Sequence, residues 1–224
     1  MRSTILVVDD DPATRKMINT ALEQSGYDVV DAGTAADAIA AIDREDPDVV
    51  LLDLILPDGD GVQVCKEVRQ YSEVNIIMVT AKRDLTDRLA GLDAGADDYV
   101  TKPLSMGELV ARVKSLLRRR RMREQEEPAE LSWGGVALQR GGRVASVEGR
   151  EASLNQVESE ILATLIAAKG EALSAEEIAA EVWDDGEGDP MVLETHIANL
   201  RHKLEEEPDH PRHLVDAEGG YRIQ

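Results

Sequence analysis

The sequence predicts two domains: an α/β domain built on a five-stranded parallel sheet, followed by a smaller domain of short strands and three helices. Through residues 1–118, solid apolar runs alternate with stretches of helical periodicity. The charged segment RRRRMREQEEP at 118–128 ends that pattern, and beyond it short apolar segments are divided by glycine pairs. A chain of 224 residues is long enough for two domains of this kind. We therefore expect domains at 1–118 and 130–224, joined by a linker at 119–129.

The strands of the first domain are predicted by its apolar runs. Ile5–Val8, Val49–Leu52 and Ile76–Val79 are continuously apolar, which is typical of strands covered on both faces. Asp28–Val30 and Tyr99–Val100 are shorter candidates, and helical stripes of apolar residues lie between the runs. Five strand–helix units predict a doubly wound, flavodoxin-like sheet with right-handed crossovers. In such sheets the functional groups gather where the strands end.

Acidic residues occupy those strand ends. Asp9 and Asp10 follow the first strand and Asp53 follows the third, so we expect their carboxylates to converge. Clustered carboxylates repel one another, and a hard divalent cation such as Mg²⁺ fits oxygen ligands. Thr80 ends the fourth strand and Lys102 follows the fifth. Together these groups can transfer a phosphoryl group to Asp53 and hold the product.

The second domain has the element order of a winged helix-turn-helix. Short apolar segments predict a small antiparallel sheet, three helical patterns follow it, and the tail predicts a hairpin that turns at 218–220. The expected strands are Leu131–Trp133, Val136–Leu138 and Val144–Val147, and the expected helices are roughly Asn155–Ala168, Ser174–Trp183 and Met191–Leu204.

Four motifs carry a family resemblance. ILVVDDDP, VVLLDLILPDGDG, IIMVTA and DDYVTKP closely resemble the receiver domain of two-component response regulators, across residues 1–118. The resemblance implies a sensor histidine kinase as partner and Asp53 as phosphoacceptor. It further implies that Lys102 contacts the phosphoryl group and that Thr80 and Tyr99 form a switch pair. The implied Mg²⁺ ligands are Asp9, Asp10, Asp53 and the backbone carbonyl of Ile55.

The fourth and fifth helical stretches carry charges of both signs, which by themselves are typical of a solvated surface. Their spacing resembles the OmpR/PhoB subfamily, whose phosphorylated receivers dimerise through this face. The resemblance implies that Arg88 meets Glu108 of the partner, that Asp93 meets Lys114, and that Asp98 meets Arg112. All three pairs have opposite signs here, so we expect a homodimer on phosphorylation. The full expected interface is Arg88, Asp93, Asp97, Asp98, Glu108, Arg112 and Lys114.

The motifs LNQVESEILATLIAAKG, LSAEEIAAEVW, THIANLRHKL and GGYRI resemble the OmpR/PhoB winged helix, across residues 130–224. The resemblance implies that Met191–Leu204 is a recognition helix that reads DNA at tandem half-sites. An α-helix in the major groove reads bases with polar side chains on its outer face. We assign to that face Val192, Thr195, His196, Asn199, His202 and Lys203, and we expect DNA contacts from Thr195, His196, Asn199, Arg201, His202, Lys203 and Arg222.

The acidity of the second domain allows a second functional hypothesis besides DNA binding. The net charge is −20, and residues 129–224 hold 8 Lys and Arg against 20 Asp and Glu, a net charge of −12 that opposes approach to DNA. The first hypothesis is a phosphorylation-switched transcription regulator. The alternative is an adaptor whose acidic winged helix binds a protein such as RNA polymerase or a kinase. An enzyme with its own substrate is not expected, because the only chemistry indicated is phosphorylation of the chain itself.

The remaining features indicate a cytoplasmic protein. No apolar run approaches the roughly 20 residues that span a membrane. Acidic residues interrupt the N-terminal apolar run before it is long enough for a secretory signal peptide. Cys65 is the single cysteine, so no internal disulfide can form.

Overall fold

The computed structural model describes residues 2–80, 91–126, 130–139, 143–183 and 190–224, with the backbone alone for 118–126. It forms two compact units, Met1–Arg118 and Arg119–Gln224. Within the described residues, no helix is long and apolar enough to cross a membrane.

The first unit contains the parallel sheet that the sequence predicts, in the order β2-β1-β3-β6-β7. All four neighbouring strand pairs are parallel. A short hairpin, β4 (Ile55–Leu56) with β5 (Gly59–Asp60), follows β3. The strands of the sheet are β1 (Thr4–Val8), β2 (Asp28–Ala32), β3 (Val49–Asp53), β6 (Asn75–Thr80) and β7 (Asp98–Thr101).

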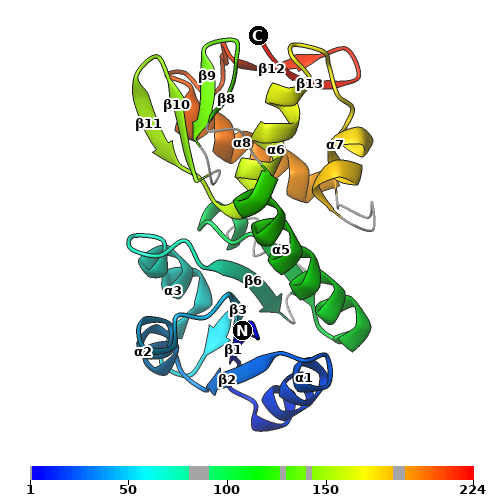
Figure 1. The fold of residues 1–224 in the computed structure, drawn as a ribbon. Coiled ribbons are helices and arrows are strands. Elements are labelled where there is room, and N and C mark those ends of the chain that lie inside the picture. Colours follow the sequence, from blue (N-terminus) through cyan, green and yellow to red (C-terminus); the bar gives the residue numbers. More distant parts are fainter. Residues whose placement is uncertain (1, 81–90, 127–129, 140–142, 184–189) are drawn as a thin grey trace. The chain divides into compact units, whose positions relative to one another are not determined.

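Helices cover both faces of this sheet. Figure 1 shows α2 and α3 on one face and α1 and α5 on the other. Asp11 caps α1 by accepting the N–H groups of Ala13 and Thr14, and Pro12 opens the helix where its missing N–H costs nothing. The sequence also predicts a helix near residues 85–92, most of which lies outside the described residues. The helices are α1 (Pro12–Gln24), α2 (Ala35–Glu45), α3 (Gly61–Val68) and α5 (Met106–Glu126).

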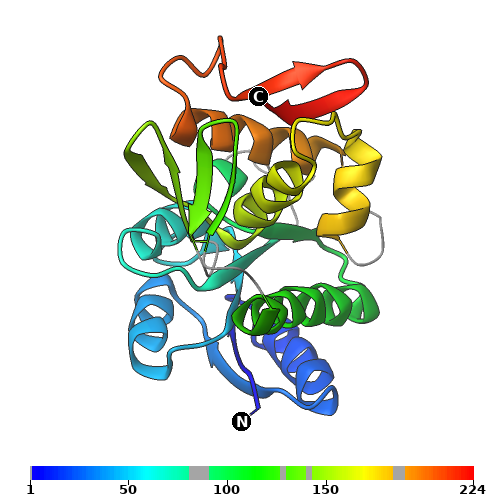
Figure 2. The same cartoon turned by 45° about the horizontal axis from the view of Figure 1, so that its top comes forward.

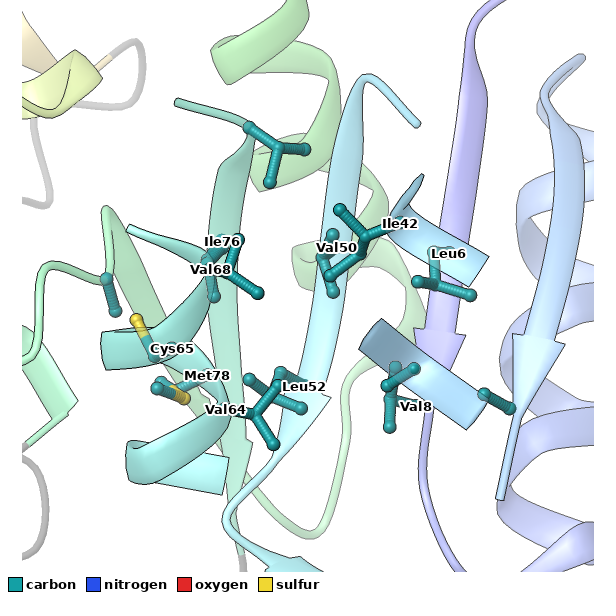
Figure 3. Packing of buried hydrophobic residues seen from close by; sticks show 14 of the residues in the cluster. Leu6, Val8, Ile42, Val50, Leu52, Val64, Cys65, Val68, Ile76 and Met78 are labelled. Carbon is teal, nitrogen blue, oxygen red and sulfur yellow. The ribbon is translucent and has the colours of Figure 1, made fainter. Parts of the chain in front are cut away.

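Each face of the sheet buries its own apolar layer. Side chains alternate along a strand, so Leu6, Val50 and Ile76 point to the layer under α2 and α3, which Figure 3 shows. Their neighbours Val7 and Leu51 face the other way and are equally buried. Because both layers are apolar, the polar side chains of the three central strands, β1, β3 and β6, lie at the strand ends.

Helix α5 runs to Glu126, so most of the segment expected to be a linker is helical. The second unit then opens with a four-stranded antiparallel sheet in the order β11-β10-β9-β8. Three of its strands match the predicted ones. The fourth, which the sequence analysis missed, follows a turn at 148–149. The strands are β8 (Glu130–Trp133), β9 (Val136–Gln139), β10 (Val144–Val147) and β11 (Arg150–Ser153).

Three helices and a hairpin complete the winged helix (Figure 2). Asn155 with Glu158 and Ser174 with Glu177 form capping boxes, which fix where the first two helices begin. The hairpin joins the body of the unit through two hydrogen bonds between the backbones of Leu173 and Tyr221, both 2.9 Å. The elements are α6 (Gln156–Ala167), α7 (Ala175–Val182), α8 (Pro190–Leu204), β12 (Leu214–Ala217) and β13 (Gly220–Ile223).

Candidate functional site

Three carboxylates converge at the carboxyl end of the parallel sheet, as their positions after β1 and β3 predict. Asp9, Asp10 and Asp53 each place an oxygen within 4.8 Å of the others. Asp9 and Asp53 are buried, whereas Asp10 is exposed. The backbone fixes two of these side chains: Asp9 accepts the N–H of Asp11 at 2.9 Å, and Asp53 accepts the N–H of Ile55 at 3.1 Å.

Lys102 brings a cation to the same point. Its ammonium donates to Asp9 Oδ2 at 2.6 Å and to Asp53 Oδ2 at 2.5 Å. The position of the lysine depends on the sheet, because its own N–H donates to the carbonyl of Thr80 at 2.7 Å and continues the pairing of β6 with β7. The structure therefore brings together the two strand ends and the lysine that the sequence analysis selected.

The cluster holds less positive than negative charge. Burial raises the pKa of Asp53 above its ordinary value, and the hydrogen bonds from Lys102 and from the Ile55 N–H offset this only in part. Burial lowers the pKa of Lys102, but its bonds to Asp53 and Asp9 outweigh that effect and leave the pKa raised. One ammonium thus neutralises one of three carboxylates, and a second cation would lower the energy of the site.

Thr80 and Tyr99 lie on the neighbouring strands β6 and β7. Thr80 ends β6 and is buried, and Tyr99 is a partly buried member of the layer that contains Met78. Met78 pairs with Tyr99 in the sheet register, so Thr80 and Tyr99 share one face. Their role as a switch pair stays a prediction.

Ile55 lies at the rim of the cluster, where its side chain is exposed. The N–H of Ile55 donates a hydrogen bond to Asp53, and Ile55 is the first residue of the β4–β5 hairpin. The hairpin returns the chain to the site at Gly61, whose N–H donates to Leu54 O at 2.9 Å. A Cβ on Gly61 would lie 2.2 Å from the carbonyl oxygen of Asp53, so only glycine fits there without moving the end of β3. The sequence analysis missed this role of Gly61.

The surface expected to form a dimer differs in part from the expectation. Asp93, Glu108 and Lys114 are exposed, as an interface requires, and Arg88 lies outside the described residues. Arg112 binds Asp98 at 2.8 Å and Glu108 at 3.0 Å, all within one chain. For Arg112 to pair with Asp98 of the partner subunit, the ion pair between Arg112 and Asp98 within the chain would have to break.

The assignment of Asp97 to the dimer face is wrong. Its side chain is 0% exposed and accepts hydrogen bonds from the Ile76 N–H at 2.8 Å and from Arg69 at 2.9 Å. Arg69 also donates to the carbonyls of Val74 and Gly95. Asp97 thus joins the start of β6 to the end of α3 inside the domain.

The recognition helix presents a different outer face from the expected one. Thr195 is 7% exposed and its hydroxyl donates to Met191 O within the helix, while His196 is 0% exposed. Their assignment to the outer face, together with that of Val192, is therefore wrong in this structure. Glu194, Ala198 and His202 are the exposed side chains of α8 beyond its first turn, along with Lys203.

Two cations of α8 are engaged inside the winged helix. Arg201 donates to the backbone carbonyl of Leu214 at 2.9 Å and to Asp216 at 2.9 Å, and it lies over the ring of Tyr221. It therefore links the recognition helix to both strands of the hairpin. Lys203 binds Glu158 at 2.6 Å, which links the same helix to the start of α6.

The other expected DNA contacts are distributed over the helix and the hairpin. Asn199 and Arg222 are half-buried, and His202 is exposed. The guanidinium of Arg222 donates to Gln224 at 3.3 Å. The Glu205 carboxylate, just after α8, accepts the backbone N–H groups of Arg212, His213 and Leu214 and so holds the loop between α8 and the hairpin.

Comparison with known proteins identifies both units. Residues 5–114 match the response regulator receiver domain, and residues 149–223 match the C-terminal domain of transcriptional regulatory proteins. The chain is 40% identical over 234 residues to the probable transcriptional regulator ycf27 of Cyanophora paradoxa, a match that covers 100% of this chain and 97% of that protein. It is 38% identical over 225 residues to the DNA-binding response regulator MtrA of Mycolicibacterium smegmatis, covering 99% and 97%.

Solved structures agree. The response regulator DrrB, a Thermotoga maritima OmpR/PhoB homologue, is 32% identical with a TM-score of 0.53, covering 100% of this chain and 99% of that one. A mutant of RitR is 21% identical with a TM-score of 0.81, covering 99% of each chain, and shows the shared fold. The chain therefore belongs to the OmpR/PhoB family of response regulators, phosphorylation-dependent transcription regulators that join a receiver domain to a DNA-binding winged helix.

Proposed function

We propose that a sensor histidine kinase phosphorylates this chain on Asp53, with Mg²⁺ as cofactor, and that the modified protein dimerises and binds tandem DNA half-sites. The observation that supports this best is the convergence of three carboxylates with Lys102 at the end of the receiver sheet. We assign the receiver to 1–118 and the winged helix to 130–224, with 119–129 between them.

The donor set fits Mg²⁺. Asp9, Asp10, Asp53 and the backbone carbonyl of Ile55 offer oxygen atoms only, and oxygen is the ligand that Mg²⁺ takes in proteins. Lys102 neutralises one of the three carboxylates, so a divalent cation balances the remaining two. Bound there, Mg²⁺ supplies charge neutralisation to the phosphoryl oxygens and to the attacking carboxylate.

The residues of the chain have separate roles in the transfer. A carboxylate oxygen of Asp53 attacks the phosphorus atom of a phosphohistidine, the P–N bond breaks, and the electron pair leaves with the imidazole of the kinase. Lys102, already within hydrogen-bond distance of Asp53, donates to the phosphoryl oxygens as their charge develops. The Thr80 hydroxyl then donates a hydrogen bond to a phosphoryl oxygen of the product, and Tyr99 follows it inward on the same face of the sheet.

The chain's output follows from the second unit. MtrA is named a DNA-binding response regulator, which favours DNA over a protein as the partner of this winged helix. We propose Asn199, His202 and Arg222 as the contacts to DNA, with Arg201 and Lys203 holding the surface in shape. RNA polymerase is a further proposed partner of the DNA-bound dimer.

The direct test is phosphorylation by a small phosphodonor. The intact protein with Mg²⁺ and acetyl phosphate should gain a single phosphoryl group by mass spectrometry, and Asp53→Asn should gain none. Asp58→Asn is the matched control, because Asp58 is an exposed carboxylate five residues away that binds the N–H groups of Ala35 and Ala36. Undiminished labelling of Asp53→Asn would refute the assignment.

A further inference from the structure

Arg15 is a second cation beside the acidic cluster, and neither the motifs nor the mechanism above uses it. It lies in the first turn of α1, where its own N–H bonds to the carbonyl of Asp11. Its side chain is 18% exposed. One terminal nitrogen, Nη1, donates to the backbone carbonyl of Asp9 at 2.6 Å and to that of Asp10 at 3.1 Å.

The guanidinium is itself held from the other side. Its Nε donates to Asp31 Oδ2 at 2.9 Å, and Asp31 lies on the neighbouring strand β2. Gly33 leaves room for the group, since a Cβ there would lie 3.3 Å from Nη1. Arg15 therefore connects β2 to the two consecutive residues whose side chains form the acidic site.

Lys102 and Arg15 bind different atoms of the acidic site, and the difference affects how a metal ion could bind there. Lys102 donates to the carboxylate oxygens of Asp9 and Asp53, which are the atoms a cation would use. At Asp9 and Asp10, the hydrogen bonds that Arg15 makes in the described structure go to the main-chain oxygens and leave the carboxylates to other partners. It can thus fix the backbone of two ligands without competing for the ligand atoms.

We propose that Arg15, anchored by Asp31, is a positioning residue that sets the affinity of the site for Mg²⁺. The inference rests on the proposed use of Mg²⁺ at Asp9, Asp10 and Asp53. Two effects of Arg15 oppose each other. Its charge repels a cation, so removing it would tighten binding, whereas its hydrogen bonds hold the ligand backbone, so removing them weakens binding. The three hydrogen bonds make positioning the larger effect, as with other groups that orient metal ligands.

The experiment is a calorimetric titration of unphosphorylated full-length protein with Mg²⁺. Arg15→Ala should raise the dissociation constant about tenfold, the lower end of the usual range for groups that orient metal ligands. Arg15→Lys keeps the charge but cannot bridge both carbonyls and Asp31, so it should fall between Arg15→Ala and wild type. Asp31→Asn should weaken binding in the same direction while leaving Arg15 in place.

Arg44→Ala is the matched control. It removes the same charge from an exposed arginine on α2 that pairs with Glu45, and it should leave Mg²⁺ affinity within about twofold of wild type. Tighter binding by Arg15→Ala, with Arg15→Lys equal to wild type, would show that the charge alone matters. Unchanged binding by both variants would show that Arg15 does not set the affinity, and either result would overturn the proposal. Should Arg15→Ala fail to fold, Arg15→Lys and Asp31→Asn decide the question by the same measurement. Absence of Mg²⁺ binding by the wild-type protein would instead refute the proposed cofactor.

Discussion

Removing the carboxylate of Asp97 should destabilise the receiver domain severely while acting on no interface. Asp97→Ala leaves the Ile76 N–H buried without its acceptor, which costs about 1–3 kcal/mol of unfolding free energy. It also leaves the Arg69 guanidinium without the carboxylate it pairs with at 2.9 Å. Breaking a buried pair by removing one partner costs about 3–5 kcal/mol in all. Against a typical total stability of roughly 5–15 kcal/mol, the variant should be close to unfolding.

The protein contains a convenient internal standard for this measurement. Both tryptophans, Trp133 and Trp183, lie in the second unit, so tryptophan fluorescence reports the winged helix. Circular dichroism reports both units. In a urea titration Asp97→Ala should move the part of the dichroism transition that belongs to the receiver to lower urea and leave the fluorescence transition in place.

Two further variants make the test specific. Asp97→Asn keeps an acceptor for the Ile76 N–H and should cost less than Asp97→Ala. Asp93→Ala removes an exposed carboxylate four residues earlier and should change stability by less than about 0.5 kcal/mol. If Asp97→Ala unfolded like wild type but failed to dimerise after phosphorylation, the buried role inferred from the structure would be refuted and the surface role restored.

Three other predictions concern the dimer, the loop after α8 and the DNA surface. If Asp98 and Arg112 pair across a two-fold dimer, the phosphorylated variants Arg112→Glu and Asp98→Arg should each fail to dimerise alone. A mixture of the two should form heterodimers, which light scattering detects. A pair that forms only within one chain would give no dimer on mixing. Burial raises the pKa of Glu205. Hydrogen bonds from the backbone N–H groups of Leu214, Arg212 and His213 lower the pKa by more, so that it lies below its ordinary value. The stability that Glu205 contributes is therefore present above pH 4.5 and lost as the pH falls through the lowered pKa. In urea unfolding at pH 7, Glu205→Gln should lower the free energy of unfolding by about 1–3 kcal/mol. The difference from wild type should shrink in acid, and a difference that stayed constant with pH would show that the charge is irrelevant. Arg201→Ala and Asp216→Asn should both weaken binding to a genomic DNA fragment that the phosphorylated wild-type protein binds, without changing the slope of log affinity against log salt concentration. A phosphate contact by Arg201 would instead make its loss reduce the magnitude of that slope by about 0.9.

The sequence predicts the receiver site well because the site is made by strand ends. Each of Asp53, Thr80 and Lys102 ends or follows a strand whose apolar run marks its position, and a parallel sheet brings such ends together. The strand β11 shows the opposite case. Its sequence REAS has no apolar alternation, because it is an edge strand with mostly exposed side chains, so periodicity gave no signal.

The side-chain roles that the sequence did not predict depend on partners far away in the chain. Asp97 looks like part of a charged surface until Arg69, 28 residues earlier, is seen beside it. Lys203 looks like a phosphate contact until Glu158, 45 residues earlier, is seen to bind it. Arg15 escaped notice for another reason: it acts on main-chain oxygens, and a pattern of side chains carries no record of such contacts.

The engaged cations of α8 bear on how phosphorylation controls DNA binding. Arg201 and Lys203 already pair with Asp216 and Glu158, so a phosphate that took either cation would leave a carboxylate behind on a domain with a net charge of −12. A single winged helix therefore has few cations available for a phosphate backbone, and its affinity for DNA should be low. If the unphosphorylated protein is a monomer, as proposed, a low affinity of one copy for DNA leaves the DNA sites empty until the protein is phosphorylated. Pairing of two receivers makes the second binding event intramolecular and multiplies the affinity without any new contact to DNA. If phosphorylation of Asp53 drives dimerisation, as proposed, the acidity that opposes DNA binding by one copy makes occupancy of the DNA depend on the dimer.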